Sequence, residues 1–461
     1  MVVAISFGAT FGASAVRAQD PAEPPNGPPT ARLLPRPTGR IDRASVDENS
    51  LRATIEELVA CGTRDSFSSW TDPKRGIGCG RDRVVARFQE IANESGGRMQ
   101  VVVDKFETAM PRTGEKLHLE NVYAILPGSD PALAKTVFMT SGHLDSRPSD
   151  VNDPNVDAPG ADDDGSGVAV ALESARLLKG TYPATLIFAV VSGEEQSVLG
   201  AQQMLKYLQG NGYTIGGYFD NDIVGADPAP GGPHRARLFS GDGPDGADSP
   251  SRELALAAEE IDGRENIRMI FRIDRLGRGG DHMPFVAAGL PATRFTEPQE
   301  NYDHQHQTPR TEGGREYGDF AKFLDYKFMG NVAWDNAEAL RELALAPAPP
   351  SEVTVTHVPR TAMGYAWLRW SAAAGEENDA QRAGFEILWR ETTEPRWSVY
   401  EFVPSGNEAT LDGVSPDNHF FAIRTVGKNG ARSLAVPAMA PMRRPPTGAT
   451  PTQPGTPPET N

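Results

Sequence analysis

Five segments of the chain place carboxylates and histidines at spacings that could bind metal ions. Imidazole nitrogens and carboxylate oxygens are the ligand atoms of catalytic Zn²⁺ sites. No single segment is specific, because a loop histidine beside an acidic residue is more often only hydrogen-bonded to its neighbour. The segments are Ser-Gly-His-Leu-Asp at residues 141–145, Ala-Asp-Asp-Asp-Gly-Ser-Gly at 161–167, Ser-Gly-Glu-Glu at 192–195, Asp-Asn-Asp-Ile-Val-Gly at 220–225 and Asn-Tyr-Asp-His-Gln-His at 301–306.

The first two segments suggest specific roles. Asp145 stands two residues after His143, where its carboxylate can orient the imidazole. The three adjacent aspartates at 162–164 repel one another unless a cation or a helix N-terminus compensates their charge. An N-cap at Asp164 or Ser166 is the simpler explanation, but it does not need all three carboxylates.

The third segment follows a continuous apolar run at residues 185–191. Two glutamates that close a buried strand are costly unless they are paired or bind a metal. A turn there can send one carboxylate to the metal and leave the other beside it as a base. Solvated loop glutamates are the alternative for Glu194 and Glu195.

The elements that must position these segments alternate between strand and helix patterns. A run of apolar residues on both faces is typical of a strand in a sheet covered by helices. The pattern predicts an α/β fold, a mixed β-sheet sandwiched by helices, with the five segments at the strand ends where such sheets bind ligands. Strands are expected near residues 100–106, 121–126, 136–140, 185–191 and 291–295, and helices near 80–91 and 168–178.

In their order, the motifs resemble peptidase family M28, a family of zinc aminopeptidases. The resemblance covers roughly residues 44–345. It runs through Cys-Gly-Thr-Arg, Arg-Gly-Ile-Gly, His-x-Asp, Pro-Gly-Ala-Asp-Asp-Asp-x-Ser-Gly, Gly-Glu-Glu, Asp-Ile-Val-Gly, Asp-His-x-Pro-Phe and a late histidine.

The resemblance implies a site for two Zn²⁺ ions. His304 is the alternative for the last ligand and Asp220 the alternative for Asp222, while Asp281 and His282 are expected to support the site. The implied roles are His143 and Asp222 on one zinc, Glu195 and His306 on the other, Asp163 as the bridge, Glu194 as the general base and Asp145 as the residue that orients His143.

The same resemblance implies hydrolysis of N-terminal peptide bonds by zinc-activated water, with peptides or proteins that have free N-termini as substrates. A carboxypeptidase and a glutaminyl cyclase-like enzyme of the same fold are alternatives. A metal-dependent binding module that has lost catalysis is a third. A Ser-His-Asp mechanism is disfavoured, because no Gly-x-Ser-x-Gly elbow follows a strand.

Composition limits the partners and the compartment. A net charge of −17 argues against a nucleic-acid partner. Residues 2–16 are apolar and small, which predicts a signal peptide and a secreted or periplasmic protein, and no later stretch is long enough to cross a bilayer. In an exported chain Cys61 and Cys79 favour a disulfide, with buried free thiols as the alternative.

After an Ala/Pro-rich linker at residues 346–351, the pattern changes to alternating apolar residues without a helical period. It predicts an all-β sandwich that resembles a fibronectin type III domain and could contact a surface, a carbohydrate or a protein. The predicted division is 1–18 signal peptide, 19–43 Pro-rich linker, 44–345 catalytic domain, 352–440 sandwich and 441–461 disordered tail.

Overall fold

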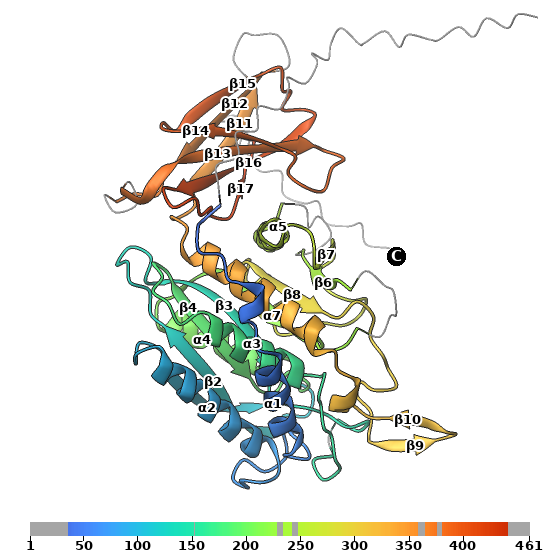
Figure 1. The fold of residues 1–461 in the computed structure, drawn as a ribbon. Coiled ribbons are helices and arrows are strands. Elements are labelled where there is room, and N and C mark those ends of the chain that lie inside the picture. Colours follow the sequence, from blue (N-terminus) through green and yellow to red (C-terminus); the bar gives the residue numbers. More distant parts are fainter. Residues whose placement is uncertain are drawn as a thin grey trace, which may run out of the picture.

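The computed structural model describes residues 36–151, 153–227, 234–241, 248–357, 365–375 and 380–440. The predicted signal peptide and tail lie outside the described residues, as does most of the predicted linker. The described chain forms one large α/β part and one smaller all-β part, and helix α5 (Pro250–Asp262) lies between them (Figure 1). None of the described helices is long and apolar enough to cross a membrane.

The larger part is built on an eight-stranded mixed sheet with the order β1-β2-β4-β3-β5-β8-β6-β7. The central strands β4, β3, β5 and β8 run parallel, whereas β2 pairs antiparallel with β1 and β4, and β6 antiparallel with β8. This confirms the predicted mixed sheet. The strands are β1 (Gln100–Ala109), β2 (Lys116–Leu126), β3 (Thr136–His143), β4 (Thr185–Val191), β5 (Thr214–Asn221), β6 (Ala236–Phe239), β7 (Ile267–Ile270) and β8 (Ala292–Thr296).

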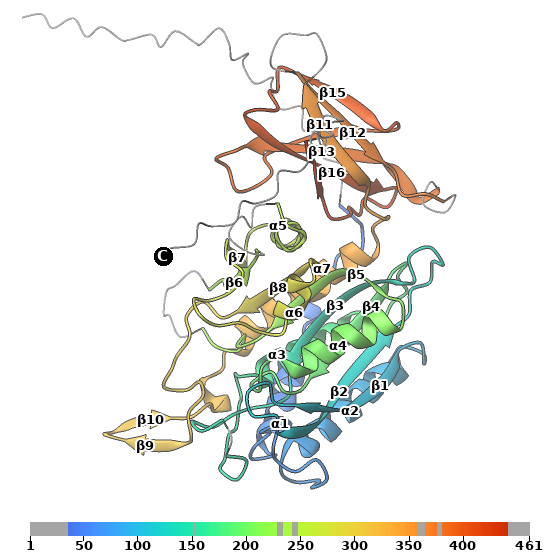
Figure 2. The same ribbon diagram turned by 180° about the vertical axis from the view of Figure 1, so that it is seen from behind.

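Helices cover both faces of this sheet (Figures 1 and 2). On one face, α1 (Glu48–Val59), α2 (Ile77–Glu94), α3 (Gly165–Leu177) and α7 (Tyr326–Ala344) pack on the sheet or on one another. On the other, α4 (Leu199–Gly210) packs on β2 and β4, and the short α6 (Met283–Ala287) on β8. Two 3₁₀ turns, η1 (Arg43–Ser45) and η2 (Ala321–Phe323), and the hairpin of β9 (Arg310–Glu312) and β10 (Arg315–Tyr317) complete the part.

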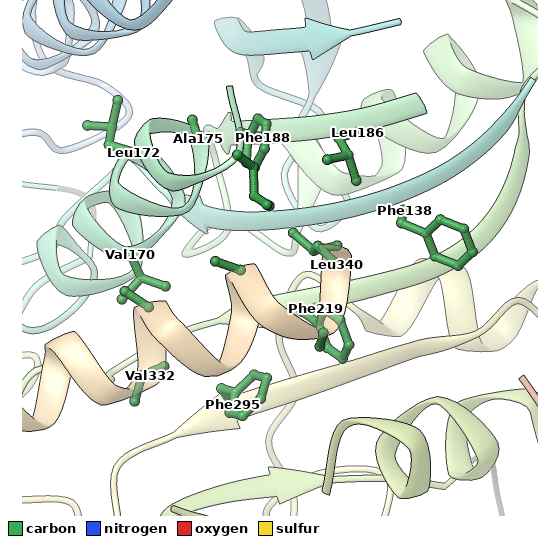
Figure 3. Close-up of a cluster of buried hydrophobic side chains, with 14 of the residues drawn as sticks. Phe138, Val170, Leu172, Ala175, Leu186, Phe188, Phe219, Phe295, Val332 and Leu340 are labelled. Atoms are coloured by element: carbon green, nitrogen blue, oxygen red, sulfur yellow. The ribbon is translucent and has the colours of Figure 1, made fainter. Parts of the chain in front are cut away.

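Both faces of strand β4 are buried, which explains why its sequence is apolar throughout. Leu186 and Phe188 belong to the core under α3 and α7, whereas the intervening Ile187 and Ala189 belong to the core under α4. Figure 3 shows Phe188 in the first of these cores, which also contains Phe219 of β5. Removing a buried aromatic side chain of this kind costs about 3–5 kcal/mol, so this core stabilises the sheet that carries the candidate site.

The smaller part consists of two antiparallel sheets, which confirms the all-β half of the predicted fold class. Its interior holds Trp370, Phe385, Trp389 and Phe421, as expected for strands with one buried face. The strands are β11 (Ser351–His357), β12 (Tyr365–Ser371) and β15 (Glu408–Asp412) in one sheet, and β13 (Arg382–Glu391), β14 (Val399–Val403), β16 (His419–Gly427) and β17 (Val436–Pro437) in the other.

The outer face of the second sheet packs against α5. Leu388 and Ala422, both fully buried, join the core of the larger part. The Nε1–H of Trp397 donates to Glu253 at 2.8 Å. Arg424 pairs with Glu260, with its Nη1 at 2.7 Å from Oε2. The two parts are therefore joined by apolar contact and by ion pairs.

The disulfide predicted for the two cysteines is present: Cys61 and Cys79 are bonded, with an S–S distance of 2.01 Å. It joins the end of the α1 region to the first turn of α2. The chain between them contains Arg64, which reaches towards the candidate site.

Candidate metal centre

The parallel strands β3, β4 and β5 end side by side, so the residues that follow them meet at one edge of the sheet (Figure 2). His143 is the last residue of β3, Glu194 and Glu195 follow β4, and Asp222 follows β5. This is the edge at which open α/β sheets bind ligands.

Asp163 reaches the same edge from the loop before α3. Its neighbour Asp164 caps that helix, since its Oδ1 accepts from Gly167 N at 2.9 Å, and its Oδ2 accepts from His143 N at 2.8 Å. The N–H of Asp163 donates to Asp319 at 2.8 Å. Asp164 therefore fills the N-cap role that the sequence suggested for one of the three aspartates, and leaves the side chain of Asp163 to face the site.

A buried arginine holds this loop from behind. Arg64 is fully buried and donates to the carbonyls of Leu144, Pro159 and Gly160 at 2.7–2.8 Å. Gly160 has φ +53°, and a Cβ there would lie 2.4 Å from the Cβ of Ser146. The loop can approach this closely only because the position is a glycine.

The structure brings the five expected ligands together in two groups. His143, Asp163 and Asp222 form one, and Asp163, Glu195 and His306 form the other; within each, one ligand atom per residue lies within 4.8 Å of the others. The two oxygens of Asp163 face different histidines. Its Oδ1 is 3.2 Å from Nε2 of His143, and its Oδ2 is 2.8 Å from Nε2 of His306.

This donor set fits a pair of metal ions. Among the described residues, Nε2 of His143 and Oε1 of Glu195 are buried without a hydrogen-bond partner. Leaving buried polar atoms unsatisfied is costly, and a bound cation would satisfy both. Two imidazoles and three carboxylates are also the ligand types that Zn²⁺ prefers.

His143 is oriented by the main chain. Its Nδ1–H donates to the carbonyl oxygen of Asp145 at 2.9 Å, whereas the Asp145 carboxylate is 3.7 Å from Nδ1. That carboxylate instead accepts from the N–H groups of Gly193, Glu194 and Glu195 at 2.7–3.2 Å. Asp145 thus orients the imidazole through its main-chain carbonyl and not, as predicted, through its carboxylate, which instead fixes the loop that carries the two glutamates.

Asp222 is held by a residue that sequence reasoning missed. The fully buried Arg294 of β8 places Nη2 2.7 Å from Oδ2 of Asp222. Burial alone would raise the pKa of Asp222, but the guanidinium and His143 hold it below its usual value. The signal in the sequence was an arginine inside an apolar strand, Ala-Thr-Arg-Phe-Thr at residues 292–296.

Glu194 lies beside the ligand groups in a cavity of about 350 Å³, which Asp222 and His306 also line. Burial raises the pKa of its carboxyl well above the usual range, and the charges of Asp222 and Glu195 add to this. Arg275 and Arg278 line the same cavity.

The alternative and supporting residues lie behind the ligands. His304 is in neither ligand group, and its ring stacks on Phe323 at a centroid distance of 3.7 Å. Asp220 is likewise outside both groups and contacts Nδ1 of His282 at 3.2 Å. Asp281 is fully buried, and within the described chain its two oxygens have no hydrogen-bond partner.

The fold and the site define an α/β protein with adjoining ligand groups for two metal ions. The sequence profile of peptidase family M28 matches residues 121–320. A probable zinc metalloprotease of Leptosphaeria maculans is 38% identical over 432 residues, which cover 88% of this chain and 98% of the relative. One of Pyricularia oryzae is 36% identical over 444 residues, 90% and 87% of the two chains. The chain belongs to peptidase family M28.

Solved structures share the fold at low identity. The LapA aminopeptidase of Legionella pneumophila has a TM-score of 0.51 and 18% identity, over 66% of this chain and 73% of that one. A glutaminyl cyclase of Fimbriiglobus ruber has the same TM-score and identity, over 67% of this chain and 99% of that one. Because a peptidase and a cyclase both share this fold, the likeness establishes the fold and does not decide which reaction the site catalyses.

Proposed function

We propose that this protein is an exported metallopeptidase that uses two zinc ions to remove N-terminal residues from peptides. The observation that carries the proposal is the position of Asp163, whose two oxygens face His143 and His306 in adjoining ligand groups. Its curated relatives, described as probable zinc metalloproteases over nearly the whole chain, support the choice of metal and of reaction.

In this proposal His143 and Asp222 would hold one zinc, Glu195 and His306 would hold the other, and Asp163 would be shared by both groups. Bound there, two zinc ions would polarise the scissile carbonyl and lower the pKa of a water molecule to about 7. Glu194 lies in the same cavity, where it would take a proton from the attacking water and pass it to the leaving amine. The three N–H bonds to Asp145 keep the Glu194 loop in place during this transfer.

Glu194 supports a substrate with a free N-terminus. Of the four carboxylates that line the cavity, those of Asp163, Glu195 and Asp222 are assigned to the zinc ions, whose charge would offset theirs. Glu194 is left to accept a hydrogen bond from the α-ammonium group of a bound peptide. A blocked N-terminus would lose this contact.

A peptide panel with the purified full chain tests the proposal. We expect release of N-terminal residues from aminoacyl-anilides and free peptides but not from N-blocked ones, loss of this activity on treatment with a chelator, and recovery on addition of Zn²⁺. Mass spectrometry of the metal content provides the parallel measurement. Cyclisation of N-terminal glutamine without hydrolysis, release from the C-terminus alone, or indifference to chelators would overturn it.

We further propose that residues 352–440 are a fibronectin type III-like module and that residues 1–18 are a signal peptide, which leads to a secreted or periplasmic protein. Two antiparallel sheets with seven strands are the architecture of such modules, and the Cys61–Cys79 bond suits an oxidising compartment. N-terminal sequencing of exported protein is expected to begin at Gln19. A mature chain that still starts at Met1 would contradict export.

A further inference from the structure

Two arginines that line the candidate active-site cavity, Arg275 and Arg278, share a carboxylate partner with a third arginine. Glu300, whose side chain is 5% exposed, accepts bonds from Arg237, Arg275 and Arg278 at 2.8–2.9 Å. A single carboxylate cannot neutralise three guanidiniums. The other partners of these arginines decide whether one of them can also bind an anion from outside the protein.

The neighbouring ion pairs do not remove this surplus. Asp274 pairs with Arg275 at 3.0 Å and with Arg294 at 3.2 Å, and Asp222 pairs with Arg294 at 2.7 Å. The connected cluster thus contains four guanidiniums, with Arg237 and Arg278, and three carboxylates, with Glu300. Asp222, moreover, is the carboxylate that the proposed function assigns to a metal.

Arg278 is the arginine of this cluster best placed to bind an anion that enters the cavity. Its side chain is 30% exposed, against 8% for Arg275, and it lines the cavity that contains Glu194. Among the described residues, its hydrogen bonds to Glu300 and to Gln305 both use Nη1. Nε and Nη2 are therefore left for a ligand, and two parallel N–H groups of a guanidinium match the two oxygens of a carboxylate.

The neighbours of Arg278 are consistent with a substrate contact. Its guanidinium lies 6.0 Å from the ring centroid of Tyr302, whose side chain is largely exposed. Leu276, in the same loop, is 84% exposed. An exposed aromatic and an exposed aliphatic side chain beside an arginine give a peptide both apolar and charged contacts.

We propose that Arg278 binds a carboxylate of the substrate close to the scissile bond. This inference rests on the proposed function, which places the reacting carbonyl at the ligand groups. The cavity of about 350 Å³ is at the small end of the roughly 300–1,000 Å³ range of ligand pockets, so a group bound at Arg278 belongs to a residue next to that carbonyl. The carboxylate is an acidic side chain on either side of the cleaved bond or the C-terminus of a dipeptide.

Three matched pairs of peptides separate these sources. They contain Glu or Gln as the N-terminal residue, Glu or Gln as the second residue, and a free or an amidated C-terminus in a dipeptide. The ratio of kcat/KM within a pair is expected to favour the carboxylate about 10- to 100-fold in one pair, the usual strength of a hydrogen bond to a charged group. In Arg278→Gln that ratio is expected to fall to about one, and Arg278→Lys is expected to restore part of it.

Arg315→Gln is the matched control, because Arg315 is on the exposed β10 and pairs with Asp303. It is expected to keep the wild-type ratio in every pair. A preference for the carboxylate that survives Arg278→Gln, or that Arg315→Gln abolishes equally, would overturn the assignment.

Measurements of peptide binding test the role of Arg278 independently of the proposed hydrolysis. Titration calorimetry of the same peptides with zinc-loaded Glu194→Gln protein measures dissociation constants without turnover. The favoured carboxylate peptide is expected to bind at least about tenfold more tightly than its neutral partner, and the additional change Arg278→Gln is expected to remove the difference. Equal binding within all three pairs would overturn the role of Arg278, whereas carboxylate-selective binding without cleavage by wild-type protein would overturn only the proposed hydrolysis.

Discussion

At the scale of single residues, the side chains of the candidate metal centre are fixed by groups outside the two ligand groups. The Nδ1–H of His143 donates a hydrogen bond to the carbonyl of Asp145, so Nε2 is the ring nitrogen that faces the site. Arg294 forms an ion pair with Oδ2 of Asp222. The other oxygen, Oδ1, is then left to face the site, where it lies 3.8 Å from Nε2 of His143. Such partners set the orientation of the ligands before any metal binds.

Glu194→Gln is expected to abolish peptide hydrolysis and keep the metal. The replacing glutamine has a similar shape but cannot accept a proton, and loss of a general base typically lowers the rate about 10²- to 10⁴-fold. Steady-state kinetics and metal analysis of the same sample provide the check. Wild-type turnover in the variant would show that another group is the base.

Arg294→Met is expected to weaken metal binding about 10- to 100-fold, the usual effect of removing a group that orients a ligand. The methionine leaves Oδ2 of Asp222 without the guanidinium, and burial then raises the pKa of that carboxyl. Competition with a zinc chelator measures the affinity. Arg268→Met on the exposed face of β7 is the control, and equal affinities in the two variants would contradict the assignment.

The candidate ligands could be predicted from the sequence because each belongs to a local motif, at a strand end for His143, Glu195 and Asp222 and in a loop for Asp163 and His306. Arg294 and Arg278 could not, since their roles depend on neighbours that are distant in sequence. Arg294 faces Asp222 only because β8 pairs with β5, with Arg294 opposite Asp220. Arg278 faces the cavity only because its loop folds over the ends of other strands.

At the scale of elements, the site depends on the close packing of α3 on β3. A Cβ on Gly142 would lie 2.3 Å from the backbone carbon of Gly167, and a Cβ on Gly167 would lie 2.2 Å from the carbonyl oxygen of Asn221 on β5. Both positions therefore have to be glycine for α3 to lie this close to the sheet. This contact brings the cap residue Asp164 within 2.8 Å of the N–H of His143.

Gly142→Ala is therefore expected to destabilise the fold by about 1–3 kcal/mol, the cost of overpacking a rigid contact. Gly210→Ala is the matched control, because no atom lies within 4 Å of a Cβ at this last position of α4. It is expected to be neutral or to stabilise by up to about 1 kcal/mol. Chemical denaturation of both variants measures the difference, and equal midpoints would contradict the packing argument.

The elements with long apolar patterns could be predicted. The short strands, and the helix whose polar side is covered by the smaller part, could not. Residues 185–191 predicted β4 with its correct bounds, because both of its faces are buried. β6 and β7 have four residues each, too few for a clear period. Helix α5 carries buried charged residues such as Glu253 and Glu259, because its polar side faces the smaller part and not solvent.

At the scale of the whole molecule, α5 is the surface on which the two parts meet. Its glutamates 253, 259 and 260 accept from Trp397, Arg396 and Arg424 of the smaller part. Glu253 and Glu259 are almost fully buried, so each depends on its partner from the other part. The smaller part is thus a fixed component of the fold.

The junction is expected to give stability a specific pH dependence. Burial raises the pKa of Glu253 from 4.5 to about 8, although the Trp397 N–H favours the charged form. Between these values the folded carboxyl keeps a proton that the unfolded chain has lost. The free energy of unfolding therefore falls as the pH rises from about 4.5 to about 8, and the full cost persists at higher pH.

Glu253→Gln is neutral at every pH and should remove this contribution. Melting temperatures measured across that range are expected to fall less with rising pH in the variant than in the wild type. Glu408→Gln, at the exposed start of β15, provides a control for replacing a glutamate in a strand of the smaller part. Parallel curves for wild type and Glu253→Gln would show that Glu253 is already charged in the folded protein.

Arg36 pairs with Glu260 at 2.9 Å and with Glu342 of α7 at 2.9 Å, and Glu260 is also the partner of Arg424. Nearby, Trp334 of α7 donates to the carbonyl of Ile41 at 2.9 Å and lies against Arg43. Proteolytic cleavage before Arg36 would keep these contacts. Cleavage after Arg36 would remove its guanidinium and with it the ion pairs to Glu260 and Glu342. Arg36 therefore marks the latest point at which a mature chain can begin and still keep the two ion pairs that tie its N-terminal segment to α5 and α7.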